Sequence, residues 1–218
     1  MNLKNKNYMF FDMDGLLIDT ETLFYTTRKA TLNKYGFPFS KADQAKYIAR
    51  GFPDTIKKLK KLVGDDELGQ NIFDESMDLF QKQLISGQIQ LKDGAIELLE
   101  FLQNHGKHCY ITSSSTKEII MQTAKTSGIA QYFENFISGD EVKKNKPAPD
   151  IYLYALKMSG ATKEESLVFE DAPSGIISGA SAGIDVIAVP DLIQPDKDVR
   201  EKAWKVFNDL SEIIKYFN

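Results

Sequence analysis

The chain has 218 residues, of which 42% are hydrophobic and 27% charged, an ordinary globular composition with room for a core and a small second module. Its net charge of −4 gives no general electrostatic reason for binding nucleic acid or an anionic membrane, so we expect neither partner. The single cysteine, Cys109, excludes an internal disulfide, and no apolar run reaches the roughly 18 residues of a membrane helix.

Short apolar runs at five places in the chain predict buried strands. They are Tyr8–Phe11, His108–Ile111, Asn135–Ile137, Leu167–Phe169 and Val186–Val189. Stretches with helical periodicity separate the last four, and "STKEIIMQTAKTSG" and "PDIYLYALKMSG" close on Gly128 and Gly160 as helix C-caps would. "AIELLEFLQNHG" is a further helix before the second run. This alternation predicts an α/β fold, a Rossmann-like parallel sheet with helices on both faces.

Residues 19–88 interrupt that alternation, because they contain helical patterns and no convincing strand. The predicted helices are Glu21–Tyr35, Asp43–Ala49, Pro53–Leu62 and Asp66–Leu84, and "SGQIQLKDG" is the predicted return linker. One strand alone cannot form a domain. We therefore expect residues 1–18 and 89–218 to form one α/β core, with residues 19–88 inserted as a helical module.

Polar side chains follow four of the predicted strands. They are Asp12 and Asp14 after the first, Thr112, Ser113 and Ser114 after the second, Lys146 beyond the third, and Glu170 and Asp171 after the fourth. Ligands of open parallel sheets bind at the carboxyl ends of the strands, so these side chains can be considered together. Carboxylates, hydroxyls and a lysine around one point suit phosphoryl transfer with Mg²⁺, in which a carboxylate can be the nucleophile and a second one the acid and base.

Four motifs extend this pattern to a known family. "DMDGLLIDTE", "YITSS", "KNKPAPD" and "VFEDAPSGI", in this order, resemble the motifs of the haloacid dehalogenase superfamily. The chain looks most similar to the subgroup of β-phosphoglucomutase and small sugar-phosphate phosphatases, in which a helical cap follows the first strand. The resemblance implies Mg²⁺ as cofactor, with Asp12 as nucleophile and metal ligand, Asp14 as general acid and base with its backbone carbonyl on the metal, and Lys146 as the neutralising cation.

The same resemblance implies roles for the other strand-end residues. Thr112 matches the phosphate-binding hydroxyl, with Ser113 and Ser114 in the same loop. Asp171 matches a metal carboxylate, with Glu170 beside it as a direct or water-mediated ligand. Simpler interpretations stay open at this point: Ser113 and Ser114 could be helix N-caps, and Glu170 a structural acid.

Asp14 favours phosphoryl transfer over dehalogenation, because dehalogenation needs no acid to protonate an alkoxide. A mutase is the alternative, but the Gly-x-x-Arg element that β-phosphoglucomutase has in its cap is matched here by Gly51 with Asp54 at the arginine position, and Arg50 only nearby. We expect a phosphatase.

The expected substrate is a small phosphorylated sugar or polyol, over which the cap would close. Candidate cap contacts are Glu21, Arg50 and Lys58. A non-catalytic phosphate-binding regulatory protein is a further alternative, although its signature, loss of Asp12 or Lys146, is missing. We expect a cytoplasmic protein, because the N-terminal stretch reaches Asp12 too soon to supply a signal-peptide core. A monomer is the default expectation for the oligomeric state.

Overall fold

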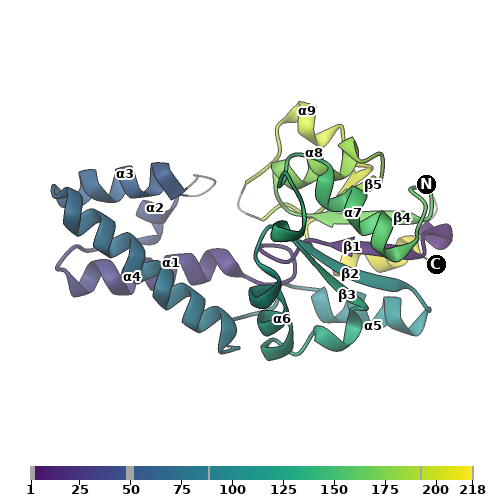
Figure 1. Cartoon of the computed structure of the whole chain (residues 1–218), viewed down its shortest axis with the longest axis horizontal. Helices are drawn as coiled ribbons and strands as arrows, with labels where there is room; N and C mark the ends of the chain where they lie inside the picture. Colours follow the sequence, from purple (N-terminus) through teal and green to yellow (C-terminus); the bar gives the residue numbers. More distant parts are fainter. Residues whose placement is uncertain (1–2, 48–51, 88, 192, 218) are drawn as a thin grey trace. The chain divides into compact units, whose positions relative to one another are not determined.

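The computed structural model describes residues 3–47, 52–87, 89–191 and 193–217, and the chain divides into two compact units (Figure 1). The core unit consists of Met1–Asp19 and Gln90–Asn218, and the helical unit is Thr20–Ile89. Both junctions lie one residue from the positions expected from the sequence.

The core unit is built on a parallel sheet with strand order β3-β2-β1-β4-β5-β6. The strands are β1 (Tyr8–Phe11), β2 (His108–Ser113), β3 (Asn135–Ser138), β4 (Ser166–Glu170), β5 (Asp185–Ala188) and β6 (Lys205–Val206). In the register, Phe11 lies opposite Ile111 of β2 and Phe169 of β4, so β1 has a neighbour on each side. The predicted α/β class is confirmed, and the two-residue strand β6 is an addition too short to show as an apolar run.

Helices cover both faces of this sheet. The helices of the core unit are α5 (Ala95–Asn104), α6 (Lys117–Thr126), α7 (Asp150–Ser159), α8 (Pro173–Ser181) and α9 (Lys197–Arg200), with 3₁₀ turns η1 (Leu3–Asn5), η2 (Ala130–Tyr132), η3 (Gly139–Glu141) and η4 (Ser211–Tyr216). Figure 1 shows α7 and α8 on one side of the sheet and α5 and α6 on the other. Strand residues alternate between the faces, so Phe10 joins the cluster under α7 and α8 while its neighbour Phe11 stacks on Phe169 at 4.2 Å between centroids.

The helical unit consists of α1 (Thr20–Lys34), α2 (Lys41–Gln44), α3 (Phe52–Val63) and α4 (Asp66–Ile85). Helices α1 and α3 both pack on α4, around a cluster that contains Leu32, Leu59 and Ile72. The prediction of a helix over Asp43–Ala49 is wrong for the part that the structure describes. A capping box between Ser40 and Asp43 starts α2 earlier, and the helix ends at Gln44.

No helix among the described residues is both long and apolar enough to cross a membrane. The thiol of Cys109 is buried on β2, as a structural thiol would be. Burial raises the pKa of this thiol to about 12, so Cys109 stays protonated and unreactive at neutral pH.

Candidate functional site

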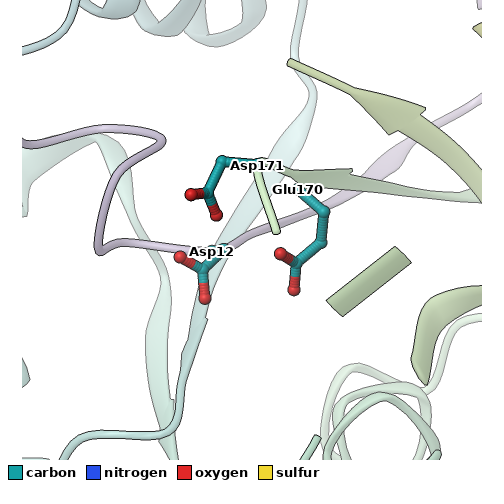
Figure 2. Close-up of side chains that lie close together, drawn as sticks. All are labelled: Asp12, Glu170 and Asp171. Carbon is teal, nitrogen blue, oxygen red and sulfur yellow. The ribbon is translucent and has the colours of Figure 1, made fainter. Parts of the chain in front are cut away.

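Three carboxylates meet at the carboxyl ends of β1 and β4. Asp12 follows β1, Glu170 is the last residue of β4, and Asp171 comes next, so the pairing of these two strands brings the three acids together. One oxygen of each lies within 4.8 Å of one oxygen of each other acid (Figure 2). Asp12 and Glu170 are buried, with 8% and 1% of their surface exposed. Such a cluster is unstable unless positive charge lies close to it.

Lys146 supplies part of that charge. Its Nζ lies 2.5 Å from Oδ1 of Asp12 and 2.6 Å from Oε1 of Glu170, and it donates to the backbone carbonyl of Thr112 at 3.0 Å. Only 5% of its side chain is exposed. Burial acts to lower the pKa of Lys146, but the carboxylates of Asp12 and Glu170 outweigh burial and hold that pKa well above its usual value. Lys146 is therefore a permanent cation in this site.

One ammonium group does not balance three carboxylates, and the remaining charge of about −2 fits a divalent cation. Burial, followed by the charge of Asp12, raises the pKa of Asp171 well above its usual value. Burial also raises the pKa of Glu170, and Lys146 opposes that shift. A hard cation would offset both shifts. Carboxylate oxygens are the ligands that Mg²⁺ takes, so Asp12, Glu170 and Asp171 fit this ion by their donor chemistry.

Without a metal, we expect the free energy of unfolding to fall as pH rises from about 4 to above 6. Asp14, Glu170 and Asp171 have raised pKa values in the folded chain, so in this window these three groups hold more protons in the folded chain than in the unfolded one. Their contribution is most favourable below the unfolded pKa values near 4 and is lost as pH rises through the folded values. Urea denaturation near pH 5 and near pH 8, in a chelator, measures the slope.

A matched measurement repeats the urea denaturations near pH 5 and near pH 8 with excess Mg²⁺. We expect the ion to stabilise the protein most near pH 8, where the acids are ionised and bind it. Equal stability at the two pH values in the chelator would contradict the prediction, because it would mean that the acid cluster costs nothing when it ionises.

Asp14 lies beside this cluster but has different partners. Its Oδ2 accepts hydrogen bonds from the hydroxyls of Ser113, at 3.0 Å, and Ser115, at 3.3 Å. Burial, followed by the charge of Asp12, raises the pKa of Asp14 to about 6. A carboxyl group with this pKa can release and accept a proton near neutral pH, which is the property of a general acid and base.

The turn that follows Asp12 and Asp14 requires a glycine at position 15, because its backbone passes close to Asp171. Gly15 has φ +87°, and a Cβ atom there would lie 2.4 Å from Oδ2 of Asp171. A side chain would be strained and would displace the carboxylate. The glycine of the sequence "DMDG" is thus explained by its contact with Asp171, the residue after β4, as well as by the turn itself.

The hydroxyl of Thr112, which the family resemblance assigns to phosphate binding, has a hydrogen-bond partner within the sheet. This hydroxyl donates to the carbonyl of Phe11 at 3.2 Å, and the residue is fully buried. The next residue, Ser113, directs its hydroxyl to Asp14, and Ser114 is exposed. Neither serine is a helix N-cap, because Thr116 precedes the first residue of α6. The hydroxyls that donate to Asp14 are those of Ser113 and Ser115.

Comparison with known proteins agrees with this geometry. A sequence model described as haloacid dehalogenase-like hydrolase matches residues 9–189. The chain belongs to this family. The family resemblance inferred from the four motifs is confirmed, and the match extends through the helical unit and all but the last of the six strands.

Relatives of this hydrolase include named phosphatases. A phosphorylated carbohydrates phosphatase of Thermotoga maritima is 27% identical over 183 residues, which cover 82% of each chain. The (DL)-glycerol-3-phosphatase 2 of Arabidopsis thaliana is 30% identical over 205 residues, 84% of this chain and 79% of its own. The crystal structure of a subfamily IA hydrolase of the superfamily from Geobacter sulfurreducens shares the fold, with a TM-score of 0.79, 15% identity and coverage of 100% of this chain and 99% of the other.

The cap contacts expected from the sequence belong to the helical unit of the hydrolase. Glu21 lies in the first turn of α1 and lines a cavity inside that unit. The Nζ of Lys58 donates to the carbonyl of Lys46 and lies 3.5 Å from Oδ2 of Asp54. Arg50 lies outside the described residues, and so does Gly51.

Sequence reasoning missed one residue of the acid cluster, Tyr152 of α7. Its hydroxyl donates to Oε1 of Glu170 at 2.5 Å, and its ring centroid lies 5.3 Å from Nζ of Lys146. The stretch that contains it predicts a helix with an apolar face, which describes α7 but not this contact. Its place in the sequence could have indicated this contact. Helix α7 starts just after the loop that contains Lys146, so a tyrosine on the buried face of its first turn comes close to that lysine.

Proposed function

We propose that this hydrolase is a Mg²⁺-dependent phosphatase that cleaves a small phosphorylated sugar or polyol through an aspartyl-phosphate on Asp12. The observation that carries the proposal is that two neighbouring acids, Asp12 and Asp14, have different surroundings. Asp12 is held against Lys146 at 2.5 Å, whereas Asp14 accepts hydrogen bonds from the hydroxyls of Ser113 and Ser115 and has a pKa of about 6. One acid is suited to attack and the other to proton transfer.

In the first step, a carboxylate oxygen of Asp12 attacks phosphorus and the bond from phosphorus to the substrate oxygen breaks. Protonated Asp14 donates its proton to that leaving oxygen, which departs as an alcohol. The hydroxyls of Ser113 and Ser115 orient the carboxyl group of Asp14 for this transfer. Lys146 offsets the negative charge on Asp12 and on the phosphoryl oxygens.

In the second step, water attacks the phosphorus of the aspartyl-phosphate. Asp14, now ionised, accepts a proton from this water, and the bond between phosphorus and the Asp12 oxygen breaks. Phosphate leaves, the carboxylate of Asp12 is restored and Asp14 is protonated again, so the cycle closes without another reactant.

Mg²⁺ would be held by Asp12, Glu170 and Asp171, and it would neutralise charge on the phosphoryl group there. Tyr152 donates to Glu170 at 2.5 Å and orients that carboxylate. Lys146 bridges Asp12 and Glu170, so the same cation serves the proposed nucleophile and the metal cluster.

Phosphatase activity is favoured over a phosphosugar mutase by the helical unit. A mutase must hold the second phosphate of a bisphosphate, and the position where the mutase family has an arginine carries Asp54, a carboxylate that pairs with Lys58. The relatives described as phosphatases of carbohydrates and of glycerol 3-phosphate support the same choice. An enzyme that keeps both Asp12 and Lys146 is not expected to be a phosphate sensor.

The deciding experiment measures phosphate release from p-nitrophenyl phosphate and from a panel of sugar, polyol and nucleoside monophosphates. We expect turnover with Mg²⁺, none after chelation, and the highest kcat/KM within the sugar and polyol group. Absence of phosphate release from every compound would overturn the phosphatase. Conversion of β-glucose 1-phosphate to glucose 6-phosphate without phosphate release would identify a mutase instead.

A further inference from the structure

A polar cavity of about 460 Å³ lies within the core unit, at the same edge of the sheet as the acid cluster. Four segments form its wall: the turn after β1, residues 90–93, and the segments that follow β5 and β6. Gly15, which passes close to Asp171, is part of this wall. So is Asp191, an acid that takes no part in the reaction proposed above.

The two carboxylate oxygens of Asp191 have different surroundings. Oδ1 accepts a hydrogen bond from Nζ of Lys92 at 2.8 Å. Oδ2 is buried and has no hydrogen-bond partner among the residues that the structure describes. Only 13% of the Asp191 side chain is exposed. Because a buried carboxylate oxygen without a donor is costly, a donor that binds beside Oδ2 would be bound favourably.

This oxygen of Asp191 lies beside Asp171. A Cβ atom on Gly15 would lie 2.4 Å from Oδ2 of Asp171 and 3.7 Å from Oδ2 of Asp191, so the two oxygens surround one point. Burial and the charge of Asp12 raise the pKa of Asp171 most, and the charge of Asp191 acts in the same direction. Asp191 is thus a direct neighbour of the acid cluster.

Backbone hydrogen bonds anchor both members of the ion pair to the strand ends that carry the acids. The N–H of Lys92 donates to the carbonyl of Leu17 at 2.9 Å, in the turn after β1. The N–H of Val189 donates to the carbonyl of Glu170 at 2.8 Å, two residues before Asp191. The pair therefore holds Asp191 at a fixed place relative to β1 and β4.

The charges indicate that the partner of Oδ2 is a hydrogen-bond donor and not a metal ion. Among the described residues, the acids whose oxygens all lie within 4.8 Å of one another are Asp12, Glu170 and Asp171, without Asp191. Lys92 already balances the charge of Asp191 through Oδ1. Mg²⁺ gives up its water reluctantly and usually keeps several water molecules when carboxylates bind it. A neutral ion pair with one unused acceptor oxygen fits such water, and the polar cavity has room for it.

We propose that Asp191 is a positioning residue of the Mg²⁺ site, that its Oδ2 accepts a hydrogen bond from water that the ion keeps, and that Lys92 holds Asp191 for this contact. The inference rests on the proposed function, in which Mg²⁺ is the cofactor. It extends the site from β1 and β4 to the segment after β5. Residues that orient the ligands of a metal in this way typically change its affinity by about 10- to 100-fold.

The test follows the Tm of the protein as Mg²⁺ is added, without substrate. Asp191→Leu keeps the branched shape of the side chain and removes the acceptor. We expect it to raise the Mg²⁺ concentration that gives a fixed increase in Tm by about 10- to 100-fold. Asp93→Leu is the matched control, because Asp93 is an exposed acid in the wall of the same cavity. Its Mg²⁺ dependence should equal that of the wild-type protein, since solvent screens an exposed charge. Unchanged Mg²⁺ dependence in Asp191→Leu would overturn the inference.

Two double variants separate the hydrogen bond from the charge, because Asp191→Leu alone leaves Lys92 unbalanced near the ion. Lys92→Met with Asp191→Leu and Lys92→Met with Asp191→Asn both remove the whole ion pair and keep the net charge. Only the second retains an acceptor oxygen, so it should bind Mg²⁺ more tightly than the first. Equal affinity of the two double variants would overturn the inference, and so would wild-type affinity in Lys92→Met with Asp191→Leu, which would show an effect of charge alone.

Phosphate release, measured separately, distinguishes this inference from the proposed function. If the variants bind Mg²⁺ in the expected order but the wild-type protein hydrolyses no compound, the role of Asp191 stands and the phosphatase fails. If the wild-type protein releases phosphate but its Tm does not respond to Mg²⁺, the inference is overturned and the phosphatase remains.

Discussion

Replacing Asp12 with asparagine is expected to lower kcat for every phosphomonoester by at least about 10³-fold, because an amide cannot take the place of the attacking carboxylate. The substitution keeps the shape of the side chain and removes one negative charge from a cluster with an excess of acids. We therefore expect the folded state to be retained, with a Tm in chelator that is equal to or higher than that of the wild-type protein. Phosphate release and thermal unfolding, measured on the same preparation, check both parts.

The combination of lost activity and retained stability separates a nucleophile from a structural acid. Asp14→Asn is the matched comparison, because it also removes an acid next to the cluster but leaves Asp12 able to attack. Asp14→Asn should retain more activity with p-nitrophenyl phosphate, whose leaving group needs no proton, than with glycerol 3-phosphate. Comparable activity of Asp12→Asn and the wild-type protein would exclude the aspartyl-phosphate route.

The acid cluster could be predicted from the sequence because its geometry follows from topology. Parallel strands end at a common edge, so Asp12 after β1 and Asp171 after β4 had to lie close together once both strands were recognised as apolar runs. The charge of Lys146 was needed for the same reason, since buried carboxylates require compensation. The positions of the acids follow from strand order, whereas the choice of Lys146 among the lysines of its loop rests on the resemblance of "KNKPAPD" to the family motif.

Other features depend on details that a pattern does not carry. Strand β2 continues to Ser113 rather than ending at Ile111, and alternation along those extra residues sends the hydroxyl of Thr112 into the sheet and that of Ser113 to Asp14. Side chains alternate along a strand, so an error of one residue in its register exchanges the hydroxyl that points into the sheet with the one that points to Asp14.

Replacing Lys146 with methionine is expected to destabilise the core unit by about 3–5 kcal/mol, because removing one partner of a buried ion pair leaves the other charge uncompensated. Here two carboxylates, those of Asp12 and Glu170, lose the same cation. At 2–4 °C per kcal/mol, the Tm should fall by about 6–20 °C. Fluorescence of Trp204, the single tryptophan, follows unfolding of the core unit, since its ring packs on Tyr216 within that unit. Lys144→Met is the matched control, because that lysine is exposed in the same loop and its loss should leave Tm unchanged.

The pH dependence of the stability lost in Lys146→Met tests whether the charge of Lys146 is the cause of that loss. Without Lys146, the carboxylate of Glu170 is buried beside other acids and has lost this cation, so its pKa, already raised by burial, rises further and the folded variant takes up protons. The loss of stability should therefore be smaller near pH 5, where Glu170 is protonated, than near pH 8, where it is ionised. Adding Glu170→Gln to Lys146→Met should recover part of the lost stability, since it removes a carboxylate that has lost its ion-pair partner. A loss that is equal at both pH values and unaffected by Glu170→Gln would mean that Lys146 stabilises the core by packing against Tyr152 and not by its charge.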